Sequence, residues 1–132
     1  MARSFRLIFR GVQGQVRQNV NLAPIHQDSA VIITACEFRF AGGVFGAAGR
    51  PFLDDAAKVY VTNIGPHNPE GGDGGVEFHI HAESPTPIDV MVTITVLEDV
   101  ESPLWCRPEA PRGWSGWAAH PQTRQQPARR WV

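Results

Sequence analysis

Two runs of alternating residues constrain the fold of this chain most strongly. In residues 76–83, and again in residues 88–98, almost every second residue is apolar. Successive side chains of a β-strand point to opposite faces, so each run predicts a strand with one buried face and one outward face. If either strand were shifted by one residue, its histidines or acidic residues would be buried. The apolar residues are therefore the ones expected to face inward. The short connection at residues 84–87 predicts that the two strands pair as a hairpin.

Further strands are predicted on both sides of this hairpin. Residues 4–10 alternate with Phe5, Leu7 and Phe9 on one face, and residues 58–64 alternate in the same way. Residues 29–40 are apolar on both faces and begin with β-branched residues, which favours a covered central strand. The 13 glycines and 11 prolines separate these runs. The expected fold class is all-β, an antiparallel β-sandwich (jelly-roll-like) in residues 1–101 with an irregular C-terminal tail.

The C-terminal tail, residues 102–132, differs in composition from the rest of the chain. It combines tryptophan, proline and arginine without any strand or helix period. Tryptophan and arginine are enriched where proteins bind one another, and exposed tryptophan is costly in water. We therefore predict a tail that is either docked, on its own body or on a partner, or disordered. The predicted binding residues of this docking arm are Trp105, Trp114, Trp117, Trp131, Arg129 and Arg130.

Charge is distributed unevenly along the chain. Residues 1–50 carry six arginines against two acidic residues, a balance of +4, and residues 103–132 carry five against one, again +4. Residues 51–102 carry one lysine against ten acidic residues, a balance of −9. Either these are solvated faces, or the basic ends meet the acidic middle within one subunit or between neighbours.

The outward face of the strand at residues 76–83 carries two histidines. His79 and His81 are two residues apart, about 7 Å along a strand, so their rings could converge on one metal ion. Glu83 is the predicted additional ligand. Other potential ligands are Asp89, His67 and His26. The competing interpretation is an ordinary polar face with an ion pair between His81 and Asp89.

The segment GGVEFHIHAE, residues 74–83, resembles the His-x-His strand of cupin metal sites. This resemblance implies a small metal-dependent enzyme that would hold a divalent metal through His79 and His81. The sequence contains no motif for serine hydrolysis, phosphate binding or a zinc site of the usual cysteine spacing. No Gly-x-Ser-x-Gly, phosphate-binding loop or Cys-x-x-Cys occurs. Cys36 is expected to be a buried thiol and Cys106 an incidental tail thiol, with a disulfide between them as the alternative.

The leading functional hypothesis is a non-catalytic interaction or assembly module. It would act through protein–protein contacts, as a homo-oligomer, with no cofactor needed and the tail as docking arm. The alternatives are the cupin-like enzyme and a carbohydrate-binding module, because exposed tryptophan can stack on sugar rings. The overall acidity and the absence of a basic stripe argue against nucleic-acid binding. No membrane span or signal peptide is recognisable, which predicts a cytoplasmic or leaderless protein.

Overall fold

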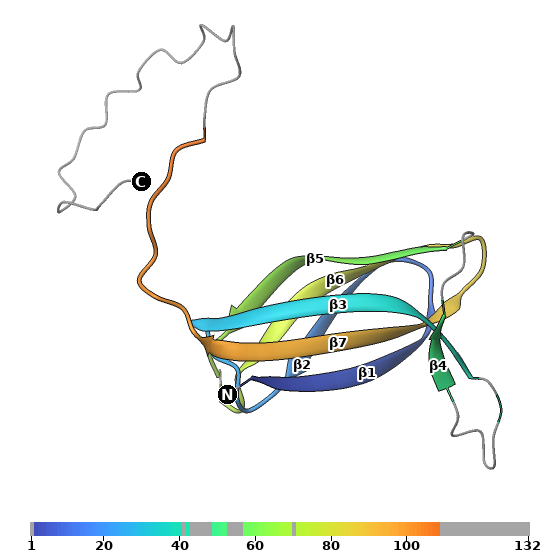
Figure 1. Cartoon of the computed structure of the whole chain (residues 1–132), viewed down its shortest axis with the longest axis horizontal. Helices are drawn as coiled ribbons and strands as arrows, with labels where there is room; N and C mark the ends of the chain where they lie inside the picture. Colours follow the sequence, from blue (N-terminus) through green and yellow to red (C-terminus); the bar gives the residue numbers. More distant parts are fainter. Residues whose placement is uncertain (1, 41, 43–48, 53–56, 70, 109–132) are drawn as a thin grey trace, which may run out of the picture. The chain divides into compact units, whose positions relative to one another are not determined.

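The computed structural model describes residues 2–40, 42, 49–52, 57–69 and 71–108. These residues contain seven β-strands and no helix. The strands are β1 (Arg3–Val12), β2 (Gly14–Asn21), β3 (Ser29–Phe40), β4 (Gly49–Phe52), β5 (Lys58–His67), β6 (Gly75–Glu83) and β7 (Ile88–Asp99). They form a four-stranded sheet in the order β1-β7-β3-β4 and a three-stranded sheet in the order β2-β6-β5, antiparallel throughout (Figure 1). The prediction of an all-β, antiparallel fold is confirmed.

The two sheets share one hydrophobic core. Alternate residues of β6 and β7 are buried and supply most of it, as the alternation predicts. The core side chains of these two strands are Val76, Phe78, Ile80, Ala82, Val90, Val92, Ile94 and Val96. Phe78 also meets Phe9 of β1 edge to face, with 6.5 Å between ring centroids. Burying this apolar surface is the main favourable term in folding.

The predicted hairpin of residues 76–98 is wrong. β6 lies between β2 and β5 in one sheet, whereas β7 lies between β1 and β3 in the other. Residues 84–87 therefore carry the chain across from one sheet to the other. Pro85 and Pro87 leave this connection with few backbone donors, and it lacks the Gly-containing turn that tight hairpins favour. The two alternating strands bury their apolar residues in one shared core instead of pairing edge to edge.

β2 is a strand that the alternation patterns of the sequence did not predict. The chain leaves β1 at Val12 and enters β2 of the other sheet at Gly14. Gly11 and Gly14 have positive φ angles of 66° and 71°, which a residue with a Cβ rarely adopts. These glycines permit the sharp change of direction between the sheets.

The connection between β2 and β3 closes one end of the core. Ile25 in this connection is almost fully buried, and its backbone nitrogen donates to the oxygen of Leu22. Leu22 in turn donates to the oxygen of Gly74, with a distance of 2.9 Å. A Cβ at Gly74 would stand 1.9 Å from the backbone oxygen of Ile25, so only glycine fits.

The chain divides into two compact units, residues 1–100 and residues 101–132. The seven strands belong to the first unit. Of the second unit, the structure describes residues 101–108. Within the described residues there is no helix long and apolar enough to cross a membrane.

We predict that Gly74→Ala destabilises the protein by about 1–3 kcal/mol, because the new methyl group collides with backbone and not with a flexible side chain. Gly72→Ala is the matched control, since a Cβ there meets nothing within 4 Å. Urea unfolding followed by circular dichroism measures both variants. Equal unfolding midpoints for the two would contradict the close approach of Gly74 and Ile25.

Candidate functional site

The outward side of the three-stranded sheet is almost entirely polar. Because β6 turns its even-numbered residues toward the core, its histidines and glutamates lie on the opposite side, as predicted. Polar residues of β2 and β5 flank them. We call this surface the polar face, and it consists of Gln15, Arg17, Asn19, Tyr60, Thr62, Glu77, His79, His81 and Glu83.

The neighbours of the two histidines differ from those expected of a hairpin. In the observed register His81 lies between Gln15 and Tyr60, and His79 lies between Arg17 and Thr62. The predicted ion pair between His81 and Asp89 is therefore wrong, since Asp89 belongs to the other sheet. Its carboxylate lies 3.6 Å from Arg10 Nε and accepts a hydrogen bond from the backbone of Gly11.

Both imidazoles are held by neighbouring side chains. His79 Nδ1 lies 3.1 Å from Gln15 Nε2, and His81 Nε2 lies 2.6 Å from Thr62 Oγ1. The His81 ring stacks on Tyr60 with 4.5 Å between centroids and 5° between planes. The two histidine rings lie 6.3 Å apart at 73°. The histidines are thus fixed in an array of hydrogen bonds and stacked rings.

The proposed third metal ligand, Glu83, accepts a hydrogen bond of 2.9 Å from the Tyr60 hydroxyl. His67 bonds Asn19 and the backbone of Asn68, and His26 lies 2.9 Å from a carboxylate oxygen of Asp99. Among the residues that the structure describes, no three His, Cys, Asp or Glu side chains gather as a metal site would require. The metal site at His79, His81 and Glu83 stays a prediction from the sequence.

Other side chains of the polar face are also paired with one another. Arg17 and Glu77 form an ion pair of 2.6 Å across β2 and β6. The pKa of Tyr60 is raised above its ordinary value. The largest cause is the hydrogen bond that the phenol donates to Glu83, followed by desolvation of the phenol and by the negative charge of Glu83. The face therefore presents planar donors and acceptors whose orientations are already set.

The Cys36 thiol is not activated as a nucleophile. Burial raises the pKa of the Cys36 thiol, and the positive charge of Arg6 opposes this only in part. A raised pKa lowers the fraction of reactive thiolate at neutral pH. Cys36 is half-buried and Cys106 is exposed, and both are free thiols.

Most of the predicted docking arm lies outside the described residues. This applies to Trp114, Trp117, Trp131, Arg129 and Arg130. Trp105 is described, and its side chain is exposed. The arm therefore stays a prediction based on composition.

Sequence reasoning missed the residues that hold the histidines. The alternation of residues 58–64 predicted a strand containing Tyr60 and Thr62, but it gave no partner for that strand. Gln15 and Arg17 lie on β2, which was not predicted at full length. Strand order depends on contacts between distant segments, so no local pattern could have identified these neighbours.

The chain was compared with protein-family models, with curated proteins and with solved structures, and no match was found. The function must therefore be argued from the surfaces themselves.

We predict that Tyr60, the only tyrosine of the chain, titrates above the usual pKa of about 10. The hydrogen bond to Glu83 therefore makes its full contribution to stability below about pH 10. This contribution is lost as the pH rises through the pKa of Tyr60 in the folded protein. Absorbance at 295 nm measures the ionisation directly. Glu83→Gln should lower the midpoint and Glu98→Gln should not. Identical midpoints in all three proteins would refute the contact.

Proposed function

We propose that this chain is a non-catalytic β-sandwich module, jelly-roll-like in arrangement, that assembles with further copies of itself through protein–protein contacts. The C-terminal tail would serve as its docking arm. Two antiparallel sheets around one core support the sandwich interpretation. The single observation that carries the functional proposal is the outward side of the four-stranded sheet.

That side exposes several large apolar side chains, with Arg6, Thr34 and Thr93 in the register between Ile32 and Ile8. We call it the apolar face, and its large side chains Ile8, Ile32, Phe40 and Leu97 are between 39% and 52% exposed. Ile8 and Cys36 lie on either side of Met91 in the register and leave it only 7% exposed. Large apolar side chains that stay exposed on one side of a soluble protein are typical of interaction sites.

Arginines stand among these apolar side chains. Arg6 and Arg10 alternate with Ile8 on β1, and the Arg10 guanidinium lies 4.8 Å from the centroid of the Phe40 ring. Arginine and aromatic residues are enriched in the centres of protein interfaces. The composition of the apolar face thus favours a protein partner over a small polar ligand.

We predict that the full chain self-associates and that Ile32→Lys weakens this association about tenfold, because a charge would have to be buried in the interface. Ile64→Lys is the matched control, since Ile64 is a comparably exposed isoleucine on β5 of the other sheet. Size-exclusion chromatography with light scattering measures both. A parent chain that is monomeric at every concentration would overturn the proposed function.

A further inference from the structure

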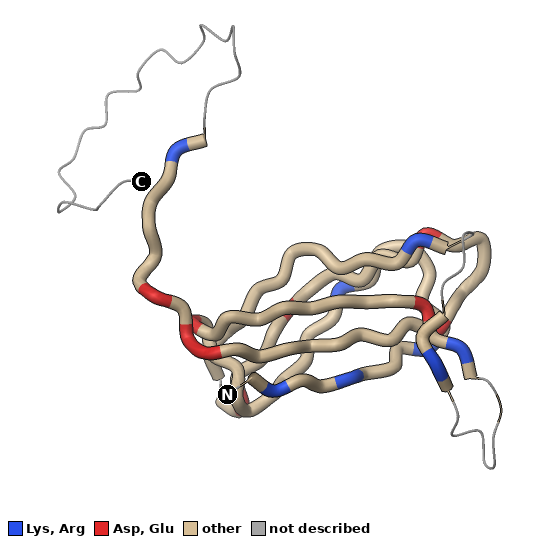
Figure 2. Tube along the Cα trace, in the orientation of Figure 1, with Lys and Arg blue, Asp and Glu red and all other residues tan. Residues whose placement is uncertain are grey.

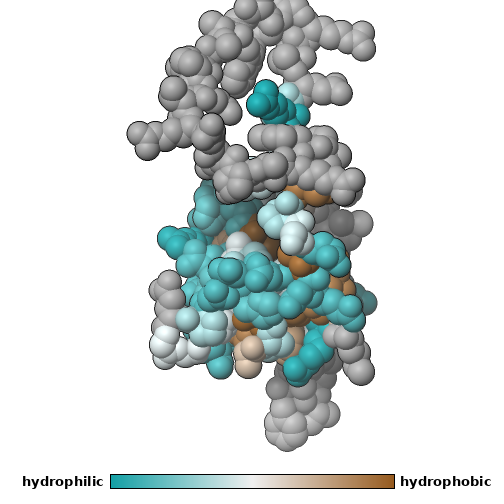
Figure 3. Space-filling view, turned by 90° about the vertical axis from the view of Figure 1, so that its left-hand side faces the viewer, coloured by the Kyte–Doolittle hydropathy of each residue, from teal (hydrophilic) through white to brown (hydrophobic). Residues whose placement is uncertain are grey.

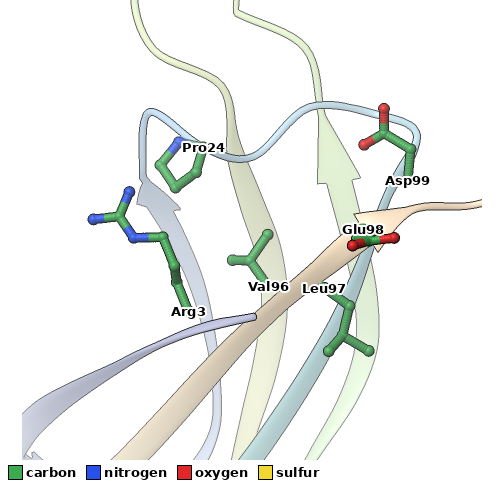
Figure 4. A pocket seen from close by; sticks show the side chains of 6 residues that line it. All are labelled: Arg3, Pro24, Val96, Leu97, Glu98 and Asp99. Atoms are coloured by element: carbon green, nitrogen blue, oxygen red, sulfur yellow. The ribbon is translucent and has the colours of Figure 1, made fainter. Parts of the chain in front are cut away.

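A pocket opens at the end of the four-stranded sheet where β1 begins and β7 finishes. Its volume is about 530 Å³, and its lining consists of Arg3, Pro24, Val96, Leu97, Glu98 and Asp99. Figure 4 shows Arg3 and Pro24 on one side, the two carboxylates on the other, and Val96 between them. Apolar side chains and carboxylates therefore lie within reach of one ligand, which suits a flat apolar group next to a cation.

Negative charge gathers around this end pocket. The backbone nitrogen of Val100 donates to the oxygen of Asp28, which holds a third acidic residue beside the end of β7. Figure 2 shows acidic positions at this end of the sheets and others at the opposite end, where basic positions lie near them. Figure 3 faces the same end, where hydrophilic residues cover most of the described surface and hydrophobic ones show between them. Such a surface attracts basic, partly apolar segments.

The C-terminal tail has the complementary chemistry. Residues 103–132 carry five arginines against one acidic residue, and three of the four tryptophans lie after residue 108. Arg129, Arg130 and Trp131 are consecutive. A guanidinium pairs well with carboxylates, and an indole ring packs well on proline and aliphatic side chains.

We propose that the end pocket binds the C-terminal tail of a second copy of this chain. Trp131 would pack against the apolar lining, and Arg129 and Arg130 would pair with Glu98 and Asp99. The carboxylate of Asp99 also lies 2.9 Å from His26 Nε2, so an arginine would share it with that histidine. This proposal rests on the assembly function proposed above and names the surface that receives the arm.

The apolar face is the less suitable receptor for this tail. That face has two arginines, Arg6 and Arg10, against the carboxylate of Asp89, whereas the end pocket has Arg3 against the two carboxylates of Glu98 and Asp99. The balance of charge therefore favours the end pocket for an arginine-rich segment. The two surfaces would thus make separate contacts between copies. One contact would be mainly apolar and the other would bring opposite charges together.

Charge reversal on each side of the contact tests the proposal in full-length chains. Glu98→Lys and Asp99→Lys, made separately, alter the pocket, and Arg129→Glu with Arg130→Glu alters the tail. Thr86→Lys is the control, because it adds positive charge at an exposed position at the opposite end of the sheets, between β6 and β7. Light scattering over a concentration series gives the self-association of each variant, and far-UV circular dichroism confirms folding.

We expect each pocket variant and the tail variant to associate about tenfold more weakly than the parent, with the control unchanged. Mixing a pocket variant with the tail variant should then recover association, since one chain supplies an intact tail and the other an intact pocket. Parent-like association of both folded pocket variants would overturn the pocket while leaving the assembly function intact. Weak association without recovery on mixing would place the tail in its own chain's pocket, against the proposal. A monomeric parent would overturn the assembly function itself.

Discussion

The core formed by the inward faces of β6 and β7 is the constraint on which the other features depend. The side chains of Phe78, Ile80, Val92 and Ile94 are almost completely buried, and both sheets contribute to the cluster around them. Each strand can bury only one set of alternate residues. Because these residues point inward, the histidines of β6 must lie on one outer surface. For the same reason Met91 of β7 lies with its apolar neighbours on another.

Because β6 and β7 lie in different sheets, the two outer surfaces have different chemistry. The polar face joins histidines, amides and Tyr60 in hydrogen bonds and stacked rings. The apolar face leaves Ile8 and Ile32 exposed, and Ile8 lies between Arg6 and Arg10 along β1. A continuous hairpin would have mixed these residues on a single sheet. The change of sheet at residues 84–87 is thus what places the polar face and the apolar face on different sheets.

The local patterns predicted much of the secondary structure and little of the strand order. Alternation correctly gave the buried and outward sides of β6, including His79 and His81. It failed to give β2 at full length, because Gln15, Arg17 and Asn19 beside glycines form no clear apolar row. It also gave the histidines the wrong neighbours, since pairing with Thr62 and Gln15 joins segments that are distant in sequence.

The sequence by itself determined the class of the fold, the direction of the side chains on the alternating strands and the contrast between an acidic middle and basic ends. These follow from chemistry that repeats over a few residues. Only the tertiary structure decided that the two alternating strands of residues 76–98 meet through the core and not edge to edge. The physical reason is that backbone hydrogen bonding is equally available to every strand, so the burial of distant apolar faces selects the partners.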